Sequence, residues 1–190
     1  ELARLIFHEL AHQVVYVRDD SVFNESFAVC VQQEGIRRWL DRYGSPQDRQ
    51  TFAMLTERRH QFTELIQRYR SRLQALYDQQ LPEATMRADK ARLFDELAGD
   101  YQALKKSWGG WPGYDRWFAQ HPNNALLASV AIYTQLVPAF QALLAQQDGN
   151  LPKFYGAVKA LAALPVEQRT ARLTDLNRSR TAAAADTVAR

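Results

Sequence analysis

The chain has 190 residues, of which 46% are hydrophobic and 24% are charged. This is the composition of an ordinary folded globular protein, and it excludes a disordered or low-complexity chain. Lys and Arg outnumber Asp and Glu by 24 to 21, and a net charge of +3 spread over several segments does not indicate a nucleic-acid partner. The single cysteine, Cys30, excludes an internal disulfide.

Helical periodicity runs through nearly the whole chain, and we find no convincing strand. Apolar residues recur every three or four positions, with only 7 prolines and 8 glycines to interrupt them. The pattern predicts an all-α fold, a multi-helix bundle. The expected helices cover about 2–17, with an apolar stripe of Leu2, Leu5, Ile6, Leu10, Val14 and Val17, then 22–43, 47–80, 83–107, 123–147, 151–163 and 166–178.

Residues 108–122 break the helical pattern, because three glycines and two prolines lie among five aromatic residues. Two hypotheses fit this segment: a hydrophobic plug between helices, or an aromatic wall of a substrate cleft.

Residues 123–147 contain no charged side chain. Polar residues and Pro138 interrupt the stretch before the ~18 consecutive apolar residues of a membrane span. We therefore expect no membrane span in this chain, and instead a buried central helix that is kinked at Pro138.

No repeat or linker divides the chain, so we expect one helical domain over residues 1–180 and a disordered tail over 181–190. The chain opens at Glu1, inside a helical pattern. This start indicates a fragment of a longer precursor.

The segment that indicates chemistry is His8-Glu9-Leu10-Ala11-His12, an H-E-x-x-H motif. Spacing of four residues places both imidazoles on one face of a helix, where they can bind one metal ion together. Glu9 lies next to the first ligand and is suited to act as the general base on a metal-bound water.

Two imidazoles leave a zinc site one protein ligand short, and Glu25 is the candidate for the third. In an antiparallel pair of helices joined by a turn near residue 20, Glu25 lies level with His12. Other acids fit less well, because Asp19 and Asp20 lie in the turn and Glu34 is more than two turns further along. The ligand types favour one Zn²⁺, which Co or Mn can replace in vitro. The alternative is a pair of core histidines with Glu25 as a capping-region acid.

These motifs resemble those of known metallopeptidases. LIFHELAHQ followed by FNESFA resembles the gluzincins, in which a Glu on the next helix completes H-E-x-x-H, and N-E-x-F-A is similar to their aminopeptidase-N-like branch. More closely, over most of residues 1–178, the chain resembles a family of bacterial zinc aminopeptidases through LARLIFHELAHQ, FNESFAVCVQQEG, NNALLASVAIYTQLVPAF and Phe154-Tyr155.

The resemblance implies that His8, His12 and Glu25 bind zinc and that Glu9 is the catalytic base. It also implies an upstream half with a lipoprotein-type signal, hence a bacterial cell-envelope location, and a substrate cleft that this upstream half helps to complete. The chain departs from the larger gluzincins at Val29, where thermolysin-like members have an acid that supports a ligand, and in its shorter linker of 12 residues between His12 and Glu25.

The expected function is zinc-dependent hydrolysis of a peptide bond by a metallopeptidase. The narrower assignment to an aminopeptidase rests on the resemblance alone, because no motif identifies an acid that would bind the free ammonium of the substrate. Tyr133 is the candidate donor to the oxyanion, and the alternative is a core tyrosine that is hydrogen-bonded to the backbone. Tyr155 and Tyr114 are similar cases. The alternative function is a helical binding or scaffold module with a structural or inactive zinc site.

Overall fold

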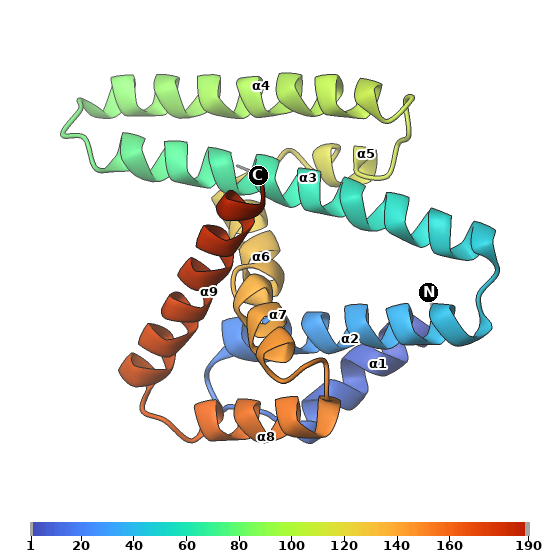
Figure 1. The fold of residues 1–190 in the computed structure, drawn as a ribbon. Coiled ribbons are helices and arrows are strands. Elements are labelled where there is room, and N and C mark those ends of the chain that lie inside the picture. Colours follow the sequence, from blue (N-terminus) through green and yellow to red (C-terminus); the bar gives the residue numbers. More distant parts are fainter. Residues whose placement is uncertain (1, 189–190) are drawn as a thin grey trace. The chain divides into compact units, whose positions relative to one another are not determined.

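The computed structural model describes the backbone of residues 2–188 and the side chains of residues 2–178. All regular structure in the described part of the chain is helical, which confirms the all-α fold (Figure 1). The disordered tail predicted for 181–190 falls on residues whose side chains are outside the described part. The helices are α1 (Leu2–Val14), α2 (Ser21–Tyr43), α3 (Pro46–Tyr77), α4 (Glu83–Ser107), α5 (Asp115–Phe118), α6 (Asn124–Thr134), α7 (Val137–Gln146), α8 (Leu151–Ala162) and α9 (Val166–Val188).

The chain divides into two compact units. One unit comprises Glu1–Ser45 and Ile132–Arg190, and the other comprises Pro46–Ala131. The boundary therefore falls within α6. The expected organisation as one domain over 1–180 stays a prediction.

The core of the unit Pro46–Ala131 is formed by α3 and α4, which pack against each other. The aromatic segment after α4 packs onto this core. The ring of Tyr114 stacks on that of Phe62 with 3.7 Å between ring centroids, and the ring of Phe118 stacks on that of Tyr101 with 4.0 Å between centroids. Trp108 is buried. These contacts favour the hydrophobic-plug hypothesis for residues 108–122.

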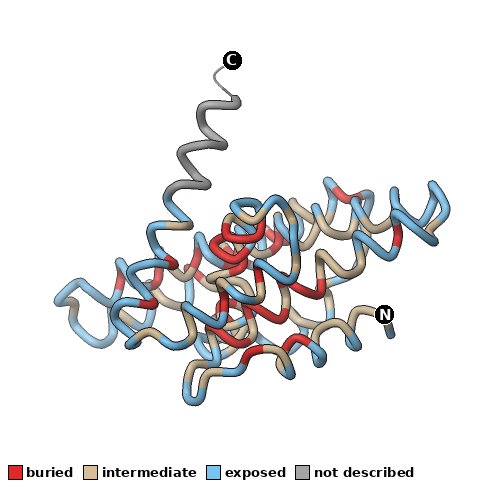
Figure 2. Tube along the Cα trace, turned by 60° about the horizontal axis from the view of Figure 1, so that its bottom comes forward, coloured by how far each residue is buried: buried red, intermediate tan, exposed pale blue. Residues whose placement is uncertain are grey.

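The core of the other unit is formed by one face of α2 together with α7, α8 and α9. Its centre is aromatic: Phe23 and Phe27 on α2 contact Phe140 on α7, and Phe27 also contacts Phe154 on α8. All four rings are fully buried. Figure 2 marks the buried residues in red. The interior of this unit holds α2 in a fixed position, and α1 packs on α2.

The apolar stripe predicted for the first helix packs only at its end, where Val14 and Val17 lie against the core. Leu2, Leu5, Ile6 and Leu10 are 46–73% exposed, whereas Ala11 is buried. The rest of the stripe faces outward because α1 turns Ala11 and the two histidines, rather than its largest aliphatic residues, toward α2.

The expected long helix over 123–147 is two helices, which corrects the prediction of one kinked helix. The break lies at Gln135 and Leu136, so that Pro138 falls in the first turn of α7, where a missing N–H costs no hydrogen bond. Only Leu127 and Ala131 are buried in α6. By length and composition alone, the stretch Asn124–Gln146 still qualifies as a candidate membrane span. In its most apolar run of 18 residues, 33% of the residues are buried.

Candidate metal centre

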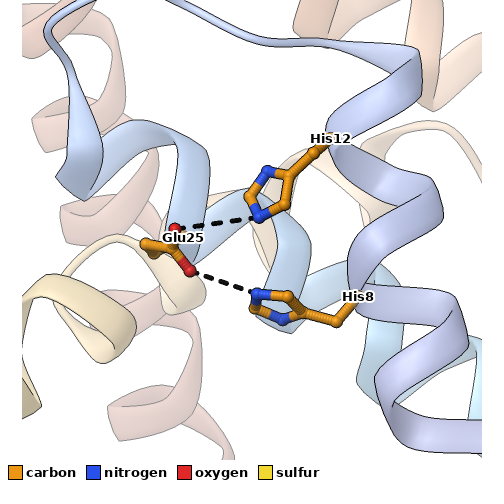
Figure 3. A group of neighbouring side chains, drawn as sticks. All are labelled: His8, His12 and Glu25. Atoms are coloured by element: carbon orange, nitrogen blue, oxygen red, sulfur yellow. Dashed lines mark hydrogen bonds and ion pairs between the residues drawn. The ribbon is translucent and has the colours of Figure 1, made fainter.

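His8, His12 and Glu25 meet where α1 packs on α2. Nε2 of His8 lies 3.1 Å from Oε2 of Glu25, and Nε2 of His12 lies 3.7 Å from Oε1. The two imidazoles extend from successive turns of α1 toward this carboxylate (Figure 3). One ligand atom from each residue falls within 4.8 Å of the others, so the three form a group that could hold a metal ion.

The connection between the helices fixes the ends of α1 and α2. Asp20 caps α2 by accepting a hydrogen bond from the Phe23 N–H at 3.1 Å. Asn24 is buried, and its carboxamide accepts a hydrogen bond from Val17 N at 2.8 Å and donates one to Val17 O at 2.7 Å. The residue before Glu25 is thereby tied to the connection that follows His12.

Small residues of α2 let α1 approach closely. A Cβ atom at Gly35 would lie only 2.7 Å from Cγ of Phe7, so the Phe7 ring packs directly over the glycine backbone. Ala28, one turn after Glu25, is fully buried. The close approach at Gly35 was not anticipated from the sequence.

The group fits the coordination preferences of zinc. Ligand atoms 2.0–2.1 Å from a tetrahedral zinc ion are separated from one another by about 3.3–3.4 Å. The two nitrogen–oxygen distances of 3.1 and 3.7 Å lie on either side of this value. All three side chains are partly buried, with 14%, 17% and 23% of the side chains of His8, His12 and Glu25 exposed. The donor set is therefore both compact and shielded.

One of the imidazoles lacks a hydrogen-bond partner for its second ring nitrogen in the described part of the chain. A metal-binding imidazole ordinarily donates its second N–H to a carboxylate or carbonyl. Nδ1 of His12 is buried and has no hydrogen-bond partner among the described residues. Val29, one turn after Glu25, has no polar side-chain atom that could serve as such a partner.

Two tyrosines flank the imidazoles. The ring centroid of Tyr133, on α6, lies 6.4 Å from that of His8, and the ring centroid of Tyr16 lies 6.2 Å from that of His12. Both are exposed, at 46% and 68%. Tyr16 was missed in the sequence, although its position four residues after His12 is a usable signal.

The other candidates do not belong to the group of three ligands. Glu9 is exposed and is not among the grouped ligand atoms. Tyr155 packs on Phe27 in the core, where burial raises its pKa. Tyr114 packs in the unit Pro46–Ala131.

The acids rejected as third ligands have other partners. Asp20 binds Arg169, and Asp19 lies 3.5 Å from Arg18. Burial alone would raise the pKa of Glu34, but hydrogen bonds from Arg37 and Arg38 outweigh it and hold the pKa below its ordinary value. Glu25 is left as the carboxylate that faces both imidazoles.

Comparison with protein families adds a second line of evidence. A family model described as "Putative aminopeptidase" matches residues 1–173. The chain belongs to this family. The match includes α1 to α8 and the first residues of α9, and so contains all three residues of the candidate metal centre. No curated protein and no solved structure matches the chain.

Proposed function

We propose that this chain is the helical, zinc-binding part of a gluzincin-type metallopeptidase that acts as an aminopeptidase. The observation that carries the proposal is the convergence of His8 Nε2 and His12 Nε2 on the two oxygens of Glu25. Membership of the family supports a peptide as the substrate. His8, His12 and Glu25 would hold the ion, because two imidazoles and one carboxylate are a zinc donor set that keeps a position open.

The residues around the ligands have separate tasks. Zinc supplies a Lewis acid that lowers the pKa of a bound water to about 7 and polarises a carbonyl. In this proposal Glu9, which follows His8 directly and is exposed, accepts the proton of the attacking water and passes it to the leaving amine. A structural zinc site would have no use for this carboxylate.

Tyr133 is the proposed donor to the oxyanion. Its ring adjoins that of His8 and nearly half of the residue is exposed, so its hydroxyl is accessible to a substrate carbonyl held at the ion. Tyr155 and Tyr114 are less suitable because both pack within cores.

Metal analysis and turnover together test the proposal. The purified protein should contain about one zinc ion per chain, and His8→Ala and Glu25→Ala should contain none. Glu9→Gln should retain zinc and lose turnover of amino-acid amides. His60→Ala is the matched control, because His60 is a surface histidine on α3 whose partner is Glu64, and it should leave zinc content unchanged.

The outcomes separate the alternatives. A wild-type protein that binds zinc but never hydrolyses a peptide or amide would be a helical module with a structural site. A protein that binds no zinc would refute the metal centre. Equal hydrolysis of peptides with free and acetylated N-termini would refute the assignment to an aminopeptidase, because that class must recognise the free ammonium.

A further inference from the structure

The break between α6 and α7 contains a side chain from another helix. In a continuous helix, the N–H of Leu136 would donate to the carbonyl of Ile132, four residues earlier. Instead, Leu136 N donates to Oγ of Ser26 at 3.2 Å, and the same Oγ donates to Ile132 O at 3.3 Å. The hydroxyl of Ser26 on α2 is therefore inserted between the carbonyl of Ile132 and the N–H of Leu136, in place of one backbone hydrogen bond of a continuous helix. We call this interrupted hydrogen bond the rung between Ile132 and Leu136.

Pro138 does not account for this insertion. Proline removes its own N–H, and its ring clashes with the carbonyl of residue i−4, so in a continuous helix both effects of Pro138 would fall on the hydrogen bond between residues 134 and 138. The rung between residues 132 and 136 has its donor, the N–H of Leu136, and its acceptor, the carbonyl of Ile132. The absence of a direct hydrogen bond between these two groups therefore needs a separate cause. Ser26 is fully buried and its hydroxyl satisfies both groups.

The insertion lies beside the candidate metal centre in two ways. Ser26 follows Glu25 directly, and Tyr133 follows Ile132 directly. The rung that Ser26 opens begins one residue before the tyrosine whose ring adjoins His8. Closing that rung would continue α6 by part of a turn and would change the direction of residues at its end.

We propose that Ser26 is a positioning residue that holds Tyr133 beside His8 by keeping the rung between Ile132 and Leu136 open. The consequence for catalysis rests on the proposed function, but the structural effect on Tyr133 does not. Asn24, Glu25 and Ser26 then have three different tasks: Asn24 ties down the connection after α1, Glu25 faces the imidazoles, and Ser26 sets the break in the apolar stretch.

The test is a nuclear Overhauser contact in metal-free protein between the ring protons of Tyr133 and the imidazole protons of His8. The wild type should show it, and Ser26→Ala should lose it while the protein stays folded. Ser129→Ala is the matched control, because the hydroxyl of this half-buried serine in α6 donates to the Leu126 carbonyl of its own helix. It should keep the contact.

Two further variants keep the test decisive. Ser26→Cys keeps a single heavy atom beyond Cβ but replaces the oxygen by a larger sulfur that hydrogen-bonds weakly, and it should weaken the contact even if Ser26→Ala does not fold. Pro138→Ala should keep the contact. A contact that survives in both folded Ser26 variants, or one that is lost in Pro138→Ala alone, would overturn the proposal.

Kinetics then addresses the catalytic consequence. If Ser26 acts through Tyr133, Ser26→Ala should lower kcat as much as Tyr133→Phe does, the double variant should lose little more, and zinc affinity should be unchanged. Additive losses in the double variant would refute an action through Tyr133. An inactive wild type would refute the proposed function and leave the Overhauser result standing.

Discussion

Asn24 binds both backbone groups of Val17, one with each end of its carboxamide. The two hydrogen bonds, at 2.8 and 2.7 Å, are made by a buried side chain. Because Glu25 follows Asn24 and Val17 lies five residues after His12, this pair fixes the position of the carboxylate relative to the imidazoles.

We expect Asn24→Ala to weaken zinc binding by about 10- to 100-fold, as loss of groups that orient metal ligands does. The variant should also lose about 2–3 kcal/mol of stability, because it leaves two backbone groups of Val17 without their partner. Zinc affinity can be measured by competition with a chelator. Asn150→Ala, which removes the cap of α8, should cost about 1 kcal/mol without changing zinc affinity. Equal zinc affinities in the two variants would contradict the expectation.

Gly35→Ala should also weaken zinc binding, through the spacing of the helices. The new Cβ would meet three ring atoms of Phe7 at 2.7–2.9 Å, so either the Phe7 ring or α1 itself must shift. We expect a loss of about 1–3 kcal/mol in stability, the usual cost of overpacking. Gly99→Ala is the control, because nothing lies within 4 Å of a Cβ there. That change in α4 should stabilise the protein by about 0.5–1 kcal/mol. A stabilising Gly35→Ala would show that the contact is not tight.

Interactions within one pair of neighbouring helices could be predicted from the sequence. Glu25 was predicted as the third ligand because helical rise places it level with His12 in an antiparallel pair of helices. The structure brings its carboxylate to both imidazoles, although α1 ends at Val14, earlier than the predicted residue 17. The helix over 83–107 was likewise predicted to the residue, since Pro82 precedes it and the glycine-rich segment follows it.

Contacts between distant segments could not be predicted in this way. Ser26 contacts residues 106 and 110 positions away, and nothing in the local pattern links them. For the same reason the break before α7 was placed at Pro138, because proline is the only local signal there. The aliphatic stripe of α1 was misjudged because a hydrophobic pattern shows that a face is apolar and does not show which face packs.

The thiol of Cys30 should be unreactive in the folded protein. Burial, and next the negative charge of Glu34, raise its pKa to about 12, against ~8.5 for a free cysteine. A thiol reagent at pH 8 should therefore label about one thiol per unfolded chain and almost none in the folded chain. Rapid labelling without denaturant would contradict the burial.

The same shift gives a pH dependence of stability. The pKa of Cys30 is higher in the folded than in the unfolded chain. The contribution of its protonated thiol to the free energy of unfolding is therefore fully present below pH ~8.5 and is lost as the pH rises toward 12. Across this window the stability of wild type relative to Cys30→Ala should fall by up to about 1.4 kcal/mol per pH unit. Urea denaturation of both proteins from pH 7 to 10 measures it, and parallel curves would contradict the shift.

The ion pair of Arg169 and Asp20 should be among the costliest to break. The Arg169 side chain is 7% exposed, donates to Oδ2 of Asp20 through Nε and Nη2, and donates through Nη1 to the carbonyls of Ala162 and Leu164. Arg169→Ala leaves the Asp20 carboxylate, 23% exposed, with its capping hydrogen bond but without its cation, so we expect a loss of about 3–5 kcal/mol in urea denaturation.

Two comparisons identify the cause of that loss. Arg178→Ala removes an exposed arginine that lies 3.9 Å from Asp175, and it should cost at most about 1 kcal/mol. Asp20→Asn combined with Arg169→Met should lose less than Arg169→Ala alone, because Asn still caps α2 and no unpaired charge remains. A double variant less stable than Arg169→Ala would show that the lost carbonyl contacts, and not the unpaired charge of Asp20, set the cost.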